Sequence, residues 1–258
     1  MYLRRPPIKK LFQCSTKGKT TLVSPESGQQ IVYFGATVNN RSGGAATVGV
    51  TFPIDTSRWK AGQWDDSAGA SYTDDTTDAQ DAGASDFALT TTTNNDGFVV
   101  QCLDKFGVVA IDVGTAEAGS PVYEYTYWNG AWTALTTCVV SSAYTAAEHV
   151  IAFPEPGDWT ALATGDTPVD TDGLTAGYYA IRMRATTAPT TAPLATKLYV
   201  AELYDFKEAV ADNGVVNFIV EDTIQGLSLP GGQGIGALFS TASANNAISI
   251  RYTTRGRV

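Results

Sequence analysis

The sequence has few of the residues that most often build catalytic and metal sites. It contains one histidine and three cysteines among 258 residues. A single histidine excludes a metal site made from several histidines, and a serine or cysteine triad would depend on His149 alone. No G-x-S-x-G motif accompanies it. In the segment HVIAF, His149 shares a strand face with Ile151 and Phe153, which favours a packed side chain over a catalytic one.

The cysteines show neither a C-x-x-C spacing nor an even number. The three are Cys14, Cys102 and Cys138. Folding in a reducing cytosol is the simpler interpretation of this pattern. Cys102 alternates in phase with Phe98 and Val100, so we expect it to be a buried free thiol.

Long apolar runs and helical periodicity are also missing. The start MYLRRPPIKKLF has no apolar core of a signal peptide, and no apolar run approaches eighteen residues, so we expect neither a signal peptide nor a membrane span. The best helical candidate, residues 203–213, is short. Segments of five to eight residues, punctuated by Gly, Asn and Asp, instead predict an all-β protein.

The formal net charge of −9 is unevenly distributed, because every Asp and Glu lies between Glu26 and Asp222. Residues 1–15 are predicted to form an extended arm, since Pro6-Pro7 favours a polyproline conformation. The first twenty residues are purely basic, and residues near the C-terminus make that end basic as well. The N-terminal cations are Arg4, Arg5, Lys9, Lys10, Lys17 and Lys19, and the C-terminal ones are Arg251, Arg255 and Arg257. Such an arm suits docking on an acidic protein surface or a contact with nucleic acid, although the acidic body disfavours nucleic acid as a partner of the protein as a whole. A solvated, disordered tail is an equally weighted alternative.

Alternating residues near the N-terminus predict a hairpin. Residues 31–38 place Val32, Phe34, Ala36 and Val38 on one face, and the turn cluster NNRSGG joins them to a second strand over 46–52. Residues 61–86 then change character, with seven aspartates and no Lys or Arg. We expect a long acidic loop or linker there, with short strands resuming from Phe87 onward.

Several short motifs resemble ligand sites without completing them. Gly18-Lys19-Thr20 lacks the earlier glycine of a phosphate-binding loop, and the glycines at 232 and 234 are followed by no helical pattern. Asp170-x-Asp172-Gly173 and Asn94-x-Asp96-Gly97 lack the first and last ligands of a calcium loop. A solvated acidic loop is favoured over a Ca²⁺ site at the acidic residues Asp65, Asp66, Asp74, Asp75 and Asp78. We assign no catalytic residue, metal or cofactor.

Aromatic side chains concentrate in VYEYTYWNGAWTAL, residues 122–135. Asn129-Gly130 predicts a two-residue type I′ turn, in a register that places Tyr127 opposite Trp132. Cross-strand aromatic pairs stabilise a sheet, so packing is the favoured role. The alternative is a glycan platform in which Tyr127, Trp128 and Trp132 stack on sugar rings.

Two distant parts of the chain together resemble one known module. TTLVSPESGQQIVYFGATVNNRSGGAATVGVTF is similar to the opening strands of small β-sandwich proteins of tailed-bacteriophage particles. Their closing strand, Gly-rich bend and last strand resemble VVNFIVEDTIQGLSLPGGQGIGALFSTASANNAISIRY. The resemblance implies that these two halves form one discontinuous domain.

The segments between them resemble a second β-sandwich module of viral and bacterial surface proteins. That module has a Y-x-Y-x-W-x-G-x-W hairpin, a P-x-D-W loop and a Y-W-I-R-x-R strand. The segment YEYTYWNGAW resembles the first of these, and Ala180 replaces the tryptophan of the last. Its presence implies two jelly-roll or immunoglobulin-like sandwiches, one inserted into the other. The expected boundaries are 1–15 for the arm, 16–70 with 198–258 for the outer domain, and 71–197 for the inserted domain.

These resemblances imply a non-enzymatic phage virion protein, with capsid decoration as the leading interpretation. It would be made in the host cytoplasm and attach to the major capsid protein or other virion proteins, as a homo-oligomer with a trimer as one option, and with no membrane partner. The alternatives are a receptor- or glycan-binding module of the tail and, at much lower weight, a glycosidase with unidentified carboxylates.

Overall fold

The chain is all-β, as the sequence predicts. The structure is a computed structural model, and it describes residues 7–18, 21–27, 29–66, 71–84, 86–137, 139–140, 143–164, 173–220, 227–229 and 233–256. In this part of the chain, strands are interrupted by one short helix, α1 (Thr76–Gln80), and one 3-10 turn, η1 (Thr56–Arg58). Two compact units are present. We call Met1–Asp55 with Ala201–Val258 the split unit, and Thr56–Val200 the central unit.

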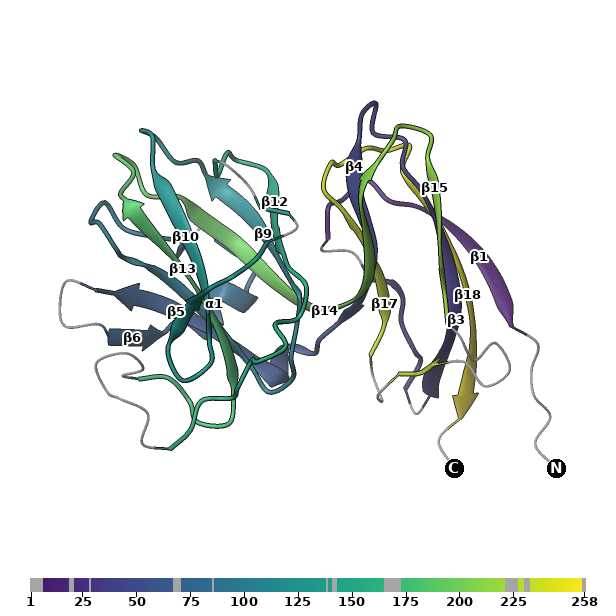
Figure 1. Cartoon of the computed structure of the whole chain (residues 1–258), viewed down its shortest axis with the longest axis horizontal. Coiled ribbons are helices and arrows are strands. Elements are labelled where there is room, and N and C mark those ends of the chain that lie inside the picture. The colour runs from purple at the N-terminus through teal and green to yellow at the C-terminus, as the bar shows by residue number, and fades with distance from the viewer. Residues whose placement is uncertain are drawn as a thin grey trace. The chain divides into compact units, whose positions relative to one another are not determined.

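The split unit is a sandwich of two antiparallel sheets (Figure 1). The first, here called the basic sheet, has the order β1 (Ile8–Gln13), β18 (Ala247–Gly256), β3 (Gln29–Asn39) and β15 (Val215–Ile219), and β16 (Leu227–Ser228) also pairs with β3. The facing sheet contains, in order, the second half of β14 (Leu194–Val210), β4 (Ala46–Pro53), β17 (Ile235–Phe239) and β2 (Thr21–Val23). Strands from the two ends of the chain therefore share each sheet.

The core of the split unit lies between these sheets. Tyr33 of β3 meets Phe52 of β4 edge to face, with ring centroids 5.6 Å apart, and Tyr204 of β14 completes the aromatic group. Edge-to-face contacts of this kind add to the stabilisation from burial alone. The remaining buried core residues are Cys14, Val23, Ile31, Ala36, Val38, Val48, Val50, Val210, Phe218, Leu229, Ile235, Ala237, Phe239, Ile248 and Ile250.

A β-bulge in β3 changes which residues face this core. Before Gly35 the inward residues include Tyr33, whereas after it they are Ala36 and Val38. The register of β3 with β18 shifts at this point, between Arg251 and Tyr252. The prediction that Val32 and Phe34 share a face with Ala36 and Val38 is therefore wrong, because the extra residue reverses the alternation.

The predicted hairpin of residues 31–52 is also wrong. The strands β3 and β4 form as expected, but they belong to opposite sheets. β3 pairs with β18, β15 and β16, while β4 pairs with β17 and β14. The NNRSGG turn thus crosses from one layer of the sandwich to the other.

The central unit contains a six-stranded sheet and a second, smaller set of strands. The six strands, in order, are β11 (Trp132–Ala134), β10 (Val122–Trp128), β13 (Tyr179–Thr187), β8 (Gly97–Cys102), β5 (Trp59–Asp65) and β6 (Ser71–Asp74). The second set comprises β12 (Glu148–Ala152), β9 (Val108–Thr115), the first residues of β14 and β7 (Phe87–Ala88). Both β8 and most of β9 are buried, which explains their near-continuous apolar sequences.

One sequence prediction fails at the border of the central unit, and the doubtful helical candidate is a strand. Residues 61–86 do not form one long loop, because they contain most of β5, all of β6 and α1. Aromatic residues of this segment, such as Trp64 and Tyr72, are buried. Residues 203–213, the best helical candidate, lie mostly in β14, where pairing with β4 overrides local propensity.

The aromatic hairpin forms with a register one residue away from the predicted one. Trp128 lies opposite Trp132, and Tyr127 lies opposite Thr133. The loop is longer than a type I′ turn and has positive φ at Gly130 but not at Asn129. The Asn129 amide instead donates to Asp158 (2.8 Å), which holds this residue in a conformation different from that of a type I′ turn.

The N-terminal segment joins a sheet over part of its length. Residues 8–13 of the expected arm form β1, an edge strand paired with β18 from Ile8↔Tyr252 to Gln13↔Ala247. Their backbone groups gain hydrogen-bond partners there, which an arm in solvent would lack. Residues 1–6 lie outside the described residues.

Candidate functional site

The predicted basic residues divide between two faces of β1. Lys9 points to the outer face of the basic sheet, whereas Lys10 points to the other side, where its Nζ lies 5.3 Å from the centre of the Phe12 ring. Lys17 lies in a bend before β2. Arg4, Arg5 and Lys19 fall outside the described residues. Only Lys9 of this group is therefore placed on the outer face of the sheet.

The basic sheet contains no acidic residue. None of the strands β1, β3, β15, β16 and β18 carries an Asp or Glu, although the chain as a whole has a net charge of −9. Arg251 lies in β18 and is paired in register with Lys9. Lys9 lies near the N-terminus of the chain and Arg251 near the C-terminus. The pairing of β1 with β18 brings these two residues side by side.

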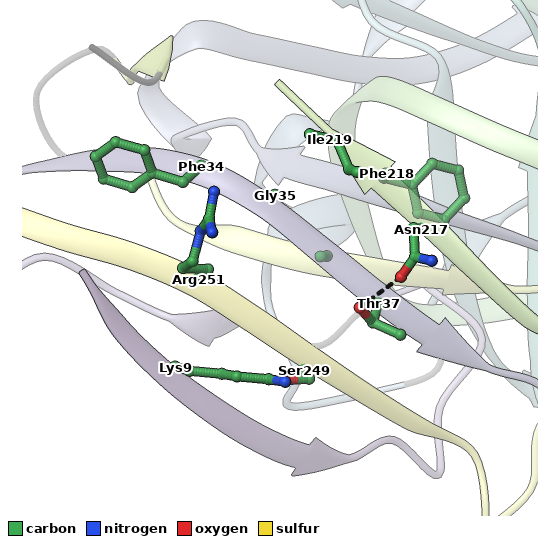
Figure 2. A pocket seen from close by; sticks show the side chains of 10 residues that line it. Lys9, Phe34, Gly35, Thr37, Asn217, Phe218, Ile219, Ser249 and Arg251 are labelled. Carbon is green, nitrogen blue, oxygen red and sulfur yellow. Dashed lines mark hydrogen bonds between the residues drawn. The ribbon is translucent and has the colours of Figure 1, made fainter. Parts of the chain in front are cut away.

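A depression of about 220 Å³ lies on this face (Figure 2). In Figure 2, Lys9 extends from β1 toward Ser249 of β18, and Arg251 points to the Phe34 side. The Arg251 guanidinium carbon is 5.9 Å from the centre of the Phe34 ring. On the other side, the Thr37 hydroxyl donates to the Asn217 side-chain oxygen over 2.7 Å. The depression therefore offers two cations and several small polar groups.

The tryptophans of the aromatic hairpin pack within the central unit. Trp128 is 2% exposed, and its ring centre lies 5.5 Å from that of Trp132. Trp132 and Trp64 each contact the Arg182 guanidinium, at 4.5 and 4.9 Å from the ring centres. Arg182 itself is 6% exposed, so this cation–π group is an internal feature of the unit.

The three tyrosines of β10 contact other parts of the central unit. The Tyr127 hydroxyl donates to Asp158 (2.7 Å), and this hydrogen bond to the carboxylate raises the pKa of Tyr127. The Tyr123 hydroxyl donates to Glu117, and burial raises the pKa of Tyr123. Burial likewise raises the pKa of Tyr125 to about 12. These phenols stay protonated at neutral pH and serve as hydrogen-bond donors.

His149 is packed as predicted. It is 5% exposed, its ring lies 5.3 Å from that of Tyr144, and its Nε2 is 2.8 Å from the Thr145 carbonyl oxygen. Cys102 is a fully buried free thiol, also as predicted, and burial raises its pKa to about 12. Cys14 is buried with its Sγ 3.8 Å from the Thr16 carbonyl oxygen, and Cys138 lies outside the described residues.

The candidate calcium ligands serve other contacts where the structure describes them. The Asp74 carboxylate accepts from the Thr76 hydroxyl (2.6 Å), and burial raises the pKa of Asp75, with the nearby Asp78 adding to the effect. Asp96 accepts from the Thr91 hydroxyl and the Asp66 amide, so it closes a turn. Across the described ranges, no three acidic, histidine or cysteine side chains gather in a way that could hold a metal ion.

Comparisons with known proteins identify no family for this chain. No protein-family model matches the chain, and no curated protein matches it. Among the described residues, no helix has the length and apolar character needed to cross a membrane.

Proposed function

We propose that this chain is a non-enzymatic structural protein of a tailed-bacteriophage particle, and that it decorates the capsid by binding the major capsid protein. The basic sheet carries this proposal. A sheet without acidic residues, in a chain of net charge −9, separates the charges so that one face attracts an acidic partner while the remainder stays soluble and repels polyanions.

The arrangement of the two units supports the proposal further. We infer that the central unit is a second sandwich domain inserted into the split unit, because the chain enters it after Asp55 and leaves it before Ala201. The split unit then serves for attachment through the basic sheet, and the inserted domain faces the medium. An attachment domain and an inserted domain would correspond to the two modules that the sequence resembles.

Burial of the aromatic hairpin favours a structural role over a glycan platform. Sugar stacking requires an exposed ring face, whereas Trp128 is 2% and Tyr127 7% exposed. The Tyr127 hydroxyl is also engaged by Asp158. These contacts support packing as the role of the hairpin.

Binding to empty, DNA-free capsids tests the proposal. We expect saturable attachment that weakens with salt, because the Debye length falls from about 10 Å at 0.1 M to ~3 Å at 1 M. Replacing Arg4, Arg5, Lys9 and Lys10 by Ser should weaken attachment while the protein remains folded. Binding that occurs only when DNA is present would instead identify nucleic acid as the partner and contradict the proposal.

A further inference from the structure

Two cations occupy directly paired positions on the basic sheet without a compensating acid. Lys9 and Arg251 are cross-strand partners, both side chains are exposed, and no described carboxylate lies within salt-bridge distance of either. Like charges directly opposite each other destabilise a sheet. Arg251 is held against the Phe34 ring, so its guanidinium is already positioned. The pair is thus a ready site for an anionic group.

The depression beside this pair has polar groups in its lining. Gly35 lines the depression together with the polar residues Ser249, Thr37 and Asn217. The Ser249 hydroxyl and the Asn217 side-chain NH₂ can donate to a carboxylate that the two cations attract, while the Thr37 hydroxyl is engaged by the Asn217 oxygen. A volume of about 220 Å³ is enough for a side chain.

Exposed aliphatic side chains border the same face. Leu11 of β1 is 70% exposed, and Ile219 and Val215 of β15 are 62% and 57% exposed. They lie on the outer side of the sheet in register with Ser249, Gly35 and Asn39. A face with an arginine, small polar residues and aliphatic borders has the composition of a protein interface.

From these observations we infer that the outer face of the basic sheet is a docking site for an acidic, partly aliphatic segment of a partner protein. A carboxylate of that segment binds within reach of Lys9 and Arg251, and aliphatic neighbours cover Leu11 and Ile219. Naming the major capsid protein as the source of this segment rests on the function proposed above. The site adds Ser249 and Asn217 to the residues that the sequence singled out.

The small number of cations on this face favours a protein over a nucleic acid as the partner. Nucleic-acid binding draws its affinity from neutralising many phosphates. On this face the strands offer Lys9, Arg251 and Arg255, while Lys10 points to the other side. The exposed aliphatic side chains at the edges of this face would bury no apolar surface against a phosphate backbone. They can do so against the apolar side chains of a peptide.

A peptide titration followed by NMR tests the site directly. The probe is a short peptide of alternating Glu and Val, compared with a Lys-Val peptide, single-stranded oligothymidylate and inorganic phosphate. We expect saturable amide shifts at Gly35, Ser249 and Arg251 with the Glu-Val peptide alone. Tighter binding of oligothymidylate, binding of phosphate as strong as that of the peptide, or no shift on this face would each overturn the inference.

Matched variants identify the residues responsible. Arg251→Ser should weaken Glu-Val binding by about tenfold or more, because a charge-assisted hydrogen bond is lost. Asn217→Glu should abolish it by placing a carboxylate of the protein itself in the depression. Lys207→Ser removes the same charge from β14, in the facing sheet, and should leave the affinity unchanged. Equal effects of Arg251→Ser and Lys207→Ser would show only a general charge effect and refute a specific site.

Capsid binding by the same variants separates this inference from the proposed function. If the peptide binds in an Arg251-dependent way but the wild-type protein does not attach to empty capsids, the site stands and capsid decoration fails. If Arg251→Ser and Asn217→Glu proteins attach to capsids as well as the wild type does, decoration stands and this docking site fails.

Discussion

Trp128 and Trp132 lie directly opposite each other in the β10–β11 hairpin, with their rings at 73° and their centres 5.5 Å apart. The two are not equivalent. Trp128 is 2% exposed, whereas Trp132 is only partly buried and packs against Arg182 and Trp64. The pair therefore has one member in the core and one that covers it.

Replacing Trp128 by Ala should lower the free energy of unfolding by about 3–5 kcal/mol, because a large buried ring leaves a cavity. Trp132→Ala should cost less, since its ring is partly exposed, but should also release the Arg182 guanidinium from one of its two aromatic contacts. Urea denaturation of both variants measures the difference.

Trp128→Phe serves as the control for this experiment, because it retains an aromatic ring and should cost less than Trp128→Ala. An unchanged urea midpoint for Trp128→Ala would contradict the packing role. If that variant also lost attachment to host cells, the glycan or receptor interpretation would be favoured.

Gly35 should resist substitution. Its φ is +145°, and a Cβ added there would lie 2.8 Å from the Phe218 carbonyl oxygen. We expect Gly35→Ala to destabilise the split unit by about 1–3 kcal/mol, because an L-residue is strained in this conformation and the bulge cannot relax without moving β15. Thermal unfolding monitored by circular dichroism would show the shift.

Gly44→Ala is the matched control, because nothing lies within 4 Å of an added Cβ and no positive φ is required there. It should leave the melting temperature nearly unchanged. Equal effects of the two substitutions would mean that the bulge at Gly35 does not restrain the sheet.

Local alternation predicted most strands, because a buried face repeats every second residue. It did not predict which strands pair. The turn after β3 looked like a hairpin loop, but the Asn40 amide donates to the Gly44 carbonyl within the turn and to the Val210 carbonyl of β14, each over 2.7 Å. Such a contact between distant residues positions the turn across the two layers, and no local pattern reveals it.

The candidate site was likewise predictable in part: the charges could be read from the sequence, but their arrangement could not. Cations near both ends of the sequence were visible in the charge distribution. Their meeting depends on the register of β1 with β18, which pairs Lys9 with Arg251 and which no spacing within either segment encodes. The bulge at Gly35 was hidden as well, because a glycine within a strand is compatible with several geometries.

Removing residues 245–258 should unfold both β1 and β3. β18 lies between these two strands, so its loss leaves β1 without its partner and β3 without its longest pairing. Hydrogen exchange should show loss of amide protection in β3 while β10 and β13 of the central unit remain protected. Retained protection in β3 would show that the N-terminal strands fold without the C-terminal strand.

The free energy of unfolding should fall at alkaline pH, because the buried Cys102 thiol and Tyr125 phenol stay protonated in the folded protein but lose their protons in the unfolded chain. Burial raises the pKa of Cys102 from 9.0 to about 12 and that of Tyr125 from 10.0 to about 12. Above the unfolded pKa, the unfolded chain binds fewer protons than the folded one, so the free energy of unfolding decreases as pH rises. The stabilisation from Cys102 is complete below pH 9 and is lost progressively as pH rises toward 12.

Urea denaturation at a series of pH values from 8 to 12 measures this loss, with the wild type compared with Cys102→Ala. The substitution should lower stability at pH 8, because it removes a buried side chain, but should flatten the decline between about pH 9 and 12, because one of the linked protons is gone. Tyr125→Phe should flatten the curve in a slightly higher range, since its unfolded pKa is 10.0. Parallel curves for Cys102→Ala and the wild type would mean that the thiol ionises as readily in the folded protein as in the unfolded chain, which is incompatible with its complete burial in β8.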